Sequence, residues 1–138
     1  MDDCIFCKMV GGEVPVTRLY EDDDVLAFLD IGPLSDGHTL VIPKQHFVRV
    51  HECDPKVLAA VGGRLPSIAG AVAEAVEADG YNVLCNNGSA AGQAVDHLHF
   101  HVIPRKKGDG VFTQWPAKKY PPGRMEEIAA RIRGNLND

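Results

Sequence analysis

The apolar positions of this chain alternate with polar ones over several short segments, and such alternation is typical of half-buried β-strands. One of these segments ends at Pro43, because proline has no N–H to donate to the ladder of a central strand. The strand over residues 39–42 could pair with the strand over residues 97–103. The predicted strands cover residues 17–20, 25–28, 39–42, 81–86 and 97–103.

A longer stretch that begins at Asp54 and Pro55 carries apolar residues at helical spacing. Asp54 suits the N-cap of a helix and Pro55 suits its first turn. Gly62, Gly63 and Pro66 predict a kink or a break, because glycine weakens a helix interior and proline removes a backbone hydrogen bond. The two glycines would also let a second helix pack closely, so this region is the first candidate for a dimer interface. The apolar positions are Val57, Val61, Leu65, Ile68, Val72 and Val76.

The predicted elements follow the order of an α+β fold. A short turn or helix over residues 4–10 precedes the first strand, and a final helix covers residues 124–133. The short connections favour an antiparallel meander over a doubly wound parallel sheet. No internal repeat or linker divides the 138 residues, so we expect a single domain over residues 1–138.

Three histidines, His97, His99 and His101, alternate with large apolar residues in the last predicted strand. Alternate side chains of a strand share a face and lie about 7 Å apart, so the three imidazoles could line a cleft wide enough for a phosphate. An imidazole can act as nucleophile, proton donor or metal ligand near neutral pH. The alternatives are a row of structural histidines, or a metal clip unrelated to catalysis.

The overall charge limits the partners that the chain can bind. Its formal net charge of −5 argues against broad binding to nucleic acid or to anionic membranes, and the basic run at residues 105–107 is interpreted as a solvated strand end. An acidic start with no long apolar run after it predicts neither a signal peptide nor a membrane span. We therefore expect a cytoplasmic protein.

Four cysteines, at positions 4, 7, 53 and 85, are expected to be free thiols or metal ligands rather than disulfides, given the expected compartment. Cys4 and Cys7 have the ligand spacing of a zinc knuckle, although the chain has no second such pair. A redox pair and two unremarkable cysteines are the alternatives. Cys85 lies in a predicted strand and is interpreted as a small buried hydrophobic residue.

Residues 92–103, which contain the three alternating histidines, resemble the signature of the histidine triad (HIT) family, His-x-His-x-His followed by two apolar residues. The segments at residues 5–8, 21–22, 26–31 and 38–46 resemble the other blocks of that family, in the same order. The resemblance implies a small domain with an antiparallel sheet of about five strands, usually a homodimer, that binds a nucleotide and transfers its nucleotidyl group.

The resemblance also implies roles for the histidines. His99 would be the nucleophile that attacks the α-phosphorus, after which water releases the nucleoside monophosphate. A neutral imidazole is a good nucleophile at pH 7, and a covalent intermediate divides one difficult displacement into two easier ones. His101 would donate to a phosphate oxygen, and His38 would support the triad.

Further positions match the nucleotide site of the family. Asp30 would hold the ribose hydroxyls, and Phe6, Phe28 and Ile31 would form an apolar slot around the base. Without the resemblance, each of these three apolar residues would be interpreted as an ordinary residue of the hydrophobic core. The substrate so implied is a small nucleotide, expected to contain adenosine.

The phosphate of the substrate would lie beside Asn86, Gln93, His101 and the backbone amides of residues 87–92. Many members with phosphoramidase activity carry a hydroxyl residue directly after the Gly-Gln pair, and here that residue is Ala94. A poor leaving amine needs more help than a nucleoside polyphosphate does. The departure therefore favours polyphosphate substrates.

Some bacterial HIT proteins close a zinc site with a histidine after the Pro-Lys strand and with the first histidine of the triad. Those positions are His46 and His97, which with Cys4 and Cys7 would give a closed, structural Cys2His2 site. In that arrangement His97 orients the triad segment and takes no part in the chemistry.

Two functions are consistent with these residues. The first is a nucleotide hydrolase that cleaves dinucleoside polyphosphates or nucleoside phosphoramidates at the α-phosphate through a nucleotidyl-His99 intermediate. The second is a nucleotide-binding regulatory or scaffold protein with incidental turnover. The presence of both His99 and His101 favours catalysis, because a pure binder has no evident need for a nucleophile.

Overall fold

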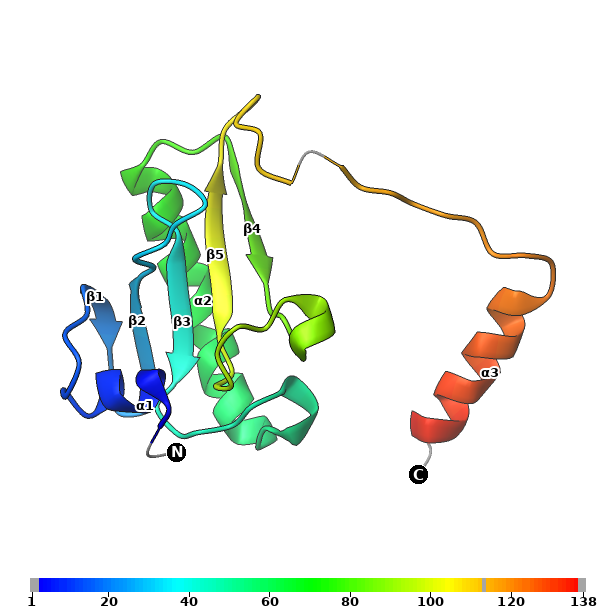
Figure 1. Cartoon of the computed structure of the whole chain (residues 1–138), viewed down its shortest axis with the longest axis horizontal. Coiled ribbons are helices and arrows are strands. Elements are labelled where there is room, and N and C mark those ends of the chain that lie inside the picture. Colours follow the sequence, from blue (N-terminus) through cyan, green and yellow to red (C-terminus); the bar gives the residue numbers. More distant parts are fainter. Residues whose placement is uncertain (1–2, 113, 137–138) are drawn as a thin grey trace.

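The computed structural model describes residues 3–112 and 114–136, and its centre is a five-stranded antiparallel sheet (Figure 1). The strands lie side by side in the order β1-β2-β3-β5-β4, so the α+β class is confirmed. A simple meander is wrong after β3, because β5 inserts between β3 and β4. The strands are β1 (Arg18–Glu21), β2 (Val25–Leu29), β3 (Thr39–Pro43), β4 (Gly80–Leu84) and β5 (Phe100–Arg105).

Both faces of the central strands are covered, which explains why β2 and β3 read as nearly continuous apolar runs. Val25, Ala27 and Val41 pack on one face against helix α2 (Pro55–Ala75). Leu26 and Leu40, on the other face, belong to a second cluster with helix α1 (Ile5–Val10). The histidines emerge on this second face, where Leu40 pairs with His101.

Helix α2 runs without interruption through Gly62, Gly63 and Pro66, so the predicted break does not occur. Asp54 caps its first turn by accepting from the backbone N–H of Lys56, as the sequence predicts. By length and composition α2 is apolar enough to cross a membrane. In this fold its buried side chains cover the sheet instead, and they are Val61, Ile68, Ala69 and Val72.

The strand that carries the triad begins later than predicted. Only His101 belongs to β5, because the backbone N–H of Leu98 donates to the carbonyl of Phe47, 2.6 Å away, and not to a neighbouring strand. β4 likewise ends at Leu84, two residues before the predicted end. Cys85 therefore lies outside the ladder and is only half-buried, which corrects its interpretation as a core residue.

The shorter elements connect the sheet to the site. Two 3-10 turns, η1 (Val50–Glu52) and η2 (Ser89–Ala91), precede α2 and the triad segment respectively. The last helix, α3 (Arg124–Leu136), lies beyond β4 at the end of an extended segment and stands clear of the sheet (Figure 1).

Two glycines test the packing of this fold in opposite directions. Gly37 has φ +88°, and an added Cβ would lie 3.0 Å from Val76 Cγ1 and 3.3 Å from Pro104 Cγ. We expect Gly37→Ala to lower the free energy of unfolding by about 1–3 kcal/mol. Gly63 lies inside α2 with no atom within 4 Å of an added Cβ, so Gly63→Ala should raise it by about 1 kcal/mol. Urea unfolding measures the free energy of unfolding of both variants. A change of the same sign and size in the two variants would contradict the crowded surroundings of Gly37 and the open surroundings of Gly63.

Candidate active site and metal centre

The imidazole of His99 is held in one tautomer by its own segment. Its Nδ1 lies 2.6 Å from the carbonyl oxygen of His97, which can only accept, so Nδ1–H is the donor. The proton of a neutral imidazole is then on Nδ1, and Nε2 carries the free lone pair. The ring is 5% exposed and packs edge-on against Phe6, with 5.1 Å between the ring centroids.

A second relay fixes the tautomer of His101. The backbone N–H of Leu34 donates to His38 Nδ1 at 3.0 Å, so the proton of His38 is on Nε2. That Nε2–H donates to His101 Nδ1, 2.9 Å away, which places the proton of His101 on Nε2. His101 Nε2 is buried and has no hydrogen-bond partner among the residues that the structure describes. This N–H is therefore available to a ligand.

The environment keeps both histidines of this relay neutral. Burial, together with the neighbouring His99 and His38, lowers the pKa of His101 to about 4. Burial also lowers the pKa of His38, against the opposing effect of Asp30, whose Oδ2 lies 3.7 Å from His38 Nε2. The hydrogen bonds from Leu34 to His38 and from His38 to His101 require an acceptor nitrogen on each ring, so both rings must be neutral.

Beside His99 and His101 lies a cavity of about 370 Å³. Of the residues predicted to bind the nucleotide, Asp30, Phe6, Phe28 and Ile31 line this cavity, as does Ala94. The side chain of Ile31 is 97% exposed, so it stands at the open edge of the slot. Several other residues line the cavity although the sequence gives no individual signal for them: Ile5, Met9, Val14, Pro15, Val16, Leu29, Leu40 and Val95.

The acidic residue of the cavity is already oriented by the chain. Asp30 Oδ1 accepts from the backbone N–H of Gly32 at 2.8 Å, and the backbone N–H of Asp30 itself donates to the carbonyl of His38. The carboxylate is thus fixed at the end of β2, where it has remaining lone pairs for the hydroxyls of a ligand.

Two residues predicted at the phosphate, Asn86 and Gln93, make side-chain hydrogen bonds to the backbone. Gln93 Oε1 accepts from the N–H of Gly88 at 2.8 Å, and its Nε2 donates to the carbonyl of Val48 at 2.7 Å. Asn86 Nδ2 donates to the carbonyl of Gly92 at 3.4 Å. In this structure both side chains hold the loop over residues 86–92, and their contact with a phosphate stays a prediction.

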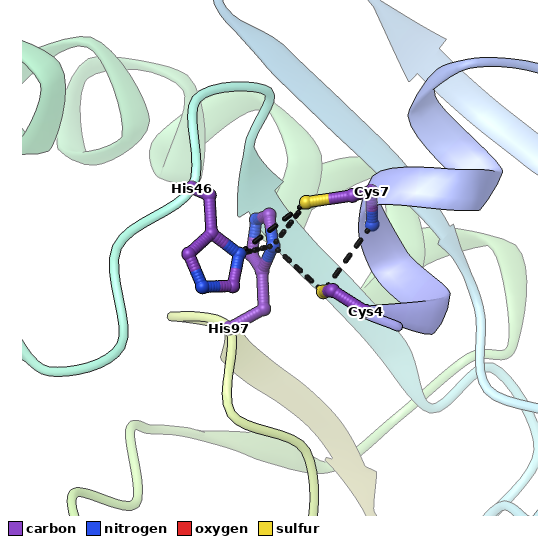
Figure 2. Close-up of side chains that lie close together, drawn as sticks. All are labelled: Cys4, Cys7, His46 and His97. Carbon is purple, nitrogen blue, oxygen red and sulfur yellow. Dashed lines mark hydrogen bonds between the residues drawn. The ribbon is translucent and has the colours of Figure 1, made fainter. Parts of the chain in front are cut away.

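The four predicted metal ligands, Cys4, Cys7, His46 and His97, converge although they come from three separate parts of the chain (Figure 2). His46 Nδ1 lies 3.2 Å from His97 Nδ1 and 3.3 Å from Cys7 Sγ, and Cys4 Sγ lies 3.4 Å from His97 Nδ1. His97 Nε2–H donates to the carbonyl of Pro43 at 2.8 Å, so its Nδ1 lone pair faces the cluster.

This donor set fits zinc. With Zn–N of about 2.05 Å and Zn–S of about 2.3 Å, a tetrahedral site has N···N edges of about 3.3 Å and N···S edges of about 3.6 Å. Burial lowers the pKa of His97 to about 4, which favours the neutral imidazole that a metal needs. Burial and Cys4 raise the pKa of the Cys7 thiol to about 11, so the Cys7 sulfur becomes a thiolate at neutral pH only with a cation beside it.

The chain belongs to the HIT family. The model of the HIT domain matches residues 11–108. The fission yeast Schizosaccharomyces pombe has a relative named adenosine 5'-monophosphoramidase hnt1, 43% identical over 135 residues, which cover 94% of this chain and 98% of that protein. Adenylylsulfatase HINT3 of Arabidopsis thaliana is 49% identical over 108 residues, covering 78% of this chain and 55% of that protein. The chain thus matches only about half of this plant relative.

Solved structures confirm the fold. The Streptococcus mutans protein SMU.412c superposes with a TM-score of 0.94 and 41% identity, covering 99% of this chain and 87% of that one. A zinc-bound histidine triad family protein from Mycobacterium smegmatis gives a TM-score of 0.75 and 38% identity, with 99% of each chain covered.

Removal of the thiols tests the metal centre. We expect about one zinc per chain in the wild type, and the double variant Cys4→Ser, Cys7→Ser should lose it and melt at a lower temperature, because structural zinc contributes directly to folding. Elemental analysis and thermal melting measure the two effects. The matched control is Cys53→Ser, which changes a buried thiol outside the cluster and should keep the zinc. Wild-type protein purified without chelator and free of metal would contradict the assignment.

Proposed function

We propose that this HIT-family nucleotide hydrolase cleaves adenosine nucleotides at the α-phosphorus through a covalent nucleotidyl intermediate on His99. The observation that carries the proposal is the pair of fixed tautomers beside one cavity. His99 Nε2 has a free lone pair, and His101 Nε2–H has no partner in the described part of the chain. A nucleophile and an unsatisfied donor side by side are the two groups that nucleotidyl transfer needs.

In the first step His99 Nε2 forms a bond to the α-phosphorus and the bond to the leaving group breaks. Charge builds up on the phosphate oxygens, and His101 Nε2–H donates to one of them. The carbonyl of His97 accepts from Nδ1–H and stabilises the positive charge that develops on the His99 ring. In the second step water attacks the phosphorus, the P–N bond breaks and the nucleoside monophosphate leaves.

The remaining cavity suits the nucleoside part of such a substrate. The apolar slot of Phe6, Phe28 and Ile31 matches a base, and the fixed Asp30 carboxylate can accept from both ribose hydroxyls. Relatives named adenosine 5'-monophosphoramidase and adenylylsulfatase support an adenosine nucleotide. The same names support nitrogen and sulfate leaving groups as further candidates, in addition to the dinucleoside polyphosphates that the Ala94 departure favours.

A bound zinc ion would cross-link α1 to the segment that carries the triad. We assign the nucleotidyl transfer itself to the imidazoles of His99 and His101. We also propose that the protein is cytoplasmic and, on the strength of the family resemblance, that it acts as a homodimer. A regulatory nucleotide-binding role is the alternative, and it predicts tight binding with negligible turnover.

Substitution of the nucleophile separates these roles. His99→Ala should keep the fold and the nucleotide affinity and lose turnover of adenosine phosphoramidate by about 10³-fold or more, because binding groups survive while the covalent route is lost. The matched control, His51→Ala, changes an exposed histidine of η1 and should keep wild-type rates.

The intermediate itself can be trapped. Wild-type protein quenched during turnover of a substrate labelled at the α-phosphate should carry an acid-labile label, which His99→Ala lacks. Near-wild-type hydrolysis by His99→Ala would remove His99 as the nucleophile.

Ala94 lines the cavity with His99 and offers no hydroxyl to the leaving group. We predict that the wild type cleaves a dinucleoside polyphosphate at least as well as an alkyl phosphoramidate, and that Ala94→Ser shifts the ratio of kcat/KM values toward the phosphoramidate. A positioned donor is typically worth about 10²–10⁴ in rate, so the shift should be measurable. Ala94→Val adds bulk without a donor and controls for shape. A strong wild-type preference for phosphoramidate, unchanged in Ala94→Ser, would show that this position does not select the leaving group.

A further inference from the structure

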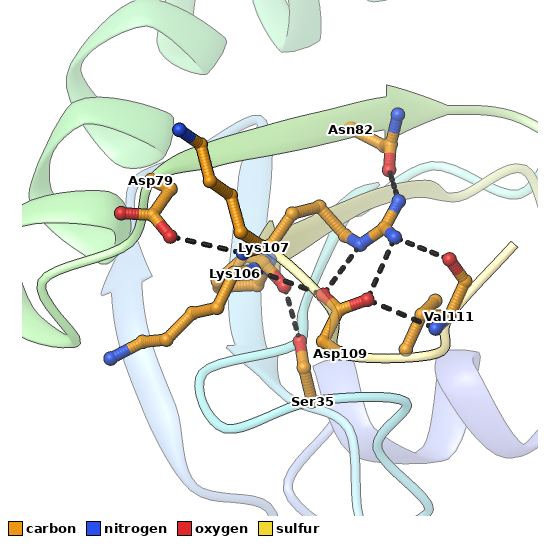
Figure 3. A network of polar contacts seen from close by, with 9 residues as sticks. Ser35, Asp79, Asn82, Lys106, Lys107, Asp109 and Val111 are labelled. Carbon is orange, nitrogen blue, oxygen red and sulfur yellow. Dashed lines mark hydrogen bonds and ion pairs between the residues drawn. The ribbon is translucent and has the colours of Figure 1, made fainter. Parts of the chain in front are cut away.

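Arg49 is the one arginine that has no carboxylate partner in the part of the chain that the structure describes. Arg105, by contrast, donates to both carboxylate oxygens of Asp109 in the turn after β5 (Figure 3). The other arginines each form an ion pair with an aspartate or a glutamate, and they are Arg18, Arg64, Arg124, Arg131 and Arg133. The exposed guanidinium of Arg49 is therefore available to an anionic ligand.

The backbone on both sides of Arg49 is hydrogen-bonded to the loop between β4 and the triad. The side-chain amide of Gln93 donates to the carbonyl of Val48 at 2.7 Å, and the backbone N–H of Val50 donates to Asn87 Oδ1 at 2.7 Å. Arg49 itself is extended, with φ −129° and ψ 157°. Its side chain therefore leaves the backbone at a fixed point beside this loop.

The guanidinium of Arg49 lies over Gly88 of the same loop. A Cβ added to Gly88 would lie 3.5 Å from Arg49 Nη2 and 3.6 Å from Arg49 Cζ. Gly88 has φ +89°, which favours glycine, and a glycine has no side chain to separate its backbone from the cation. The contact places a positive charge on the loop whose backbone amides are predicted to face the phosphate.

A second cavity connects the nucleotide site with the segment that carries Arg49. It has a volume of about 420 Å³ and shares Ile5, Ala94 and Val95 with the cavity beside His99. Val48, the residue before Arg49, also lines the second cavity. Space for a leaving group thus continues from the nucleotide site past Ala94 toward the Arg49 segment.

Charge decides which leaving group this space can accept. Asp3 and Asp96 line the second cavity, and their carboxylates repel a polyphosphate. The chain as a whole is also negative, with a formal net charge of −5. A polyphosphate therefore needs a cation close to its path, and the unpaired guanidinium of Arg49 is such a cation. A guanidinium stays charged at neutral pH and can donate two parallel hydrogen bonds to one phosphate.

We propose that Arg49 binds the departing phosphates of a dinucleoside polyphosphate and so favours this leaving group over an amine. This role rests on the proposed function, because it assigns a leaving group to the cleavage at His99. An amine carries no phosphate for Arg49 to bind, so cleavage of a phosphoramidate gains nothing from the contact. Ala94 donates to neither leaving group, which makes the guanidinium the group that distinguishes them.

Relative rates test this role. Arg49→Ala should lower kcat/KM for diadenosine tetraphosphate by about tenfold or more relative to kcat/KM for adenosine phosphoramidate, because a charge-assisted contact is lost. Arg49→Lys keeps the charge without the planar fork and should restore part of the ratio. The matched control is Arg64→Ala, which removes an arginine from α2 on the opposite face of the sheet and should keep the wild-type ratio. An unchanged ratio in Arg49→Ala, or equal losses with both substrates, would overturn the proposal.

Binding separates the role of Arg49 from the proposed hydrolysis. Titration calorimetry with AMP and with ATP is carried out in the His99→Ala background, where neither nucleotide is consumed. Adding Arg49→Ala should raise the Kd of ATP by about tenfold or more and change the Kd of AMP much less. That result with a wild type that hydrolyses neither substrate would support the role of Arg49 and overturn the proposed function. A Kd of ATP that Arg49→Ala does not alter would overturn the role of Arg49 and leave the hydrolysis standing.

Discussion

The site depends on His97, because this one residue contacts the Cys2His2 cluster, the end of β3 and the His99 ring at the same time. Its Nδ1 faces Cys4, Cys7 and His46, its Nε2–H donates to the carbonyl at the end of β3, and its own carbonyl accepts from His99. The contact that fixes the tautomer of His99, the proposed nucleophile, is therefore made by a residue of the Cys2His2 cluster. A shift of His97 would alter the orientation of His99 without any change at the reacting atoms.

Phe6 adds a second connection between the Cys2His2 cluster and His99, the proposed nucleophile. It lies in α1, between Cys4 and Cys7 in sequence, and its ring is edge-on to His97 at 5.8 Å, to His99 at 5.1 Å and to Phe28 at 5.5 Å. A six-residue helix has little stability alone, so its position rests on the Cys2His2 cluster and on this aromatic packing. The wall of the proposed base slot is thus positioned by the same cluster that contacts the triad segment.

The sequence predicted the strands well, and the four side chains that it assigned to a metal do lie together, because both features leave local or family-wide signals. Apolar alternation placed the strands to within two or three residues, and the spacing of Cys4 and Cys7 suggested the cluster. The later start of β5 was missed because Leu98 satisfies its N–H with Phe47, a contact that no pattern in residues 97–103 encodes. The continuity of α2 was missed because packing against the sheet outweighs the local cost of Pro66.

The roles of Gln93 and Ala94 show where sequence reasoning ends at the site. Both follow the loop over residues 86–92, yet the amide of Gln93 binds the backbone of Val48 and Gly88, while Ala94 lines the cavity. The proposed base end of the cavity is built from β2 and α1, whose packing is shared with the core, so a substitution there would disturb the fold. At the proposed leaving-group end, Ala94 follows the loop and lies outside every strand and helix, so a substitution there is expected to disturb the sheet less. Leaving-group preference is therefore expected to diverge among relatives more readily than recognition of the nucleoside.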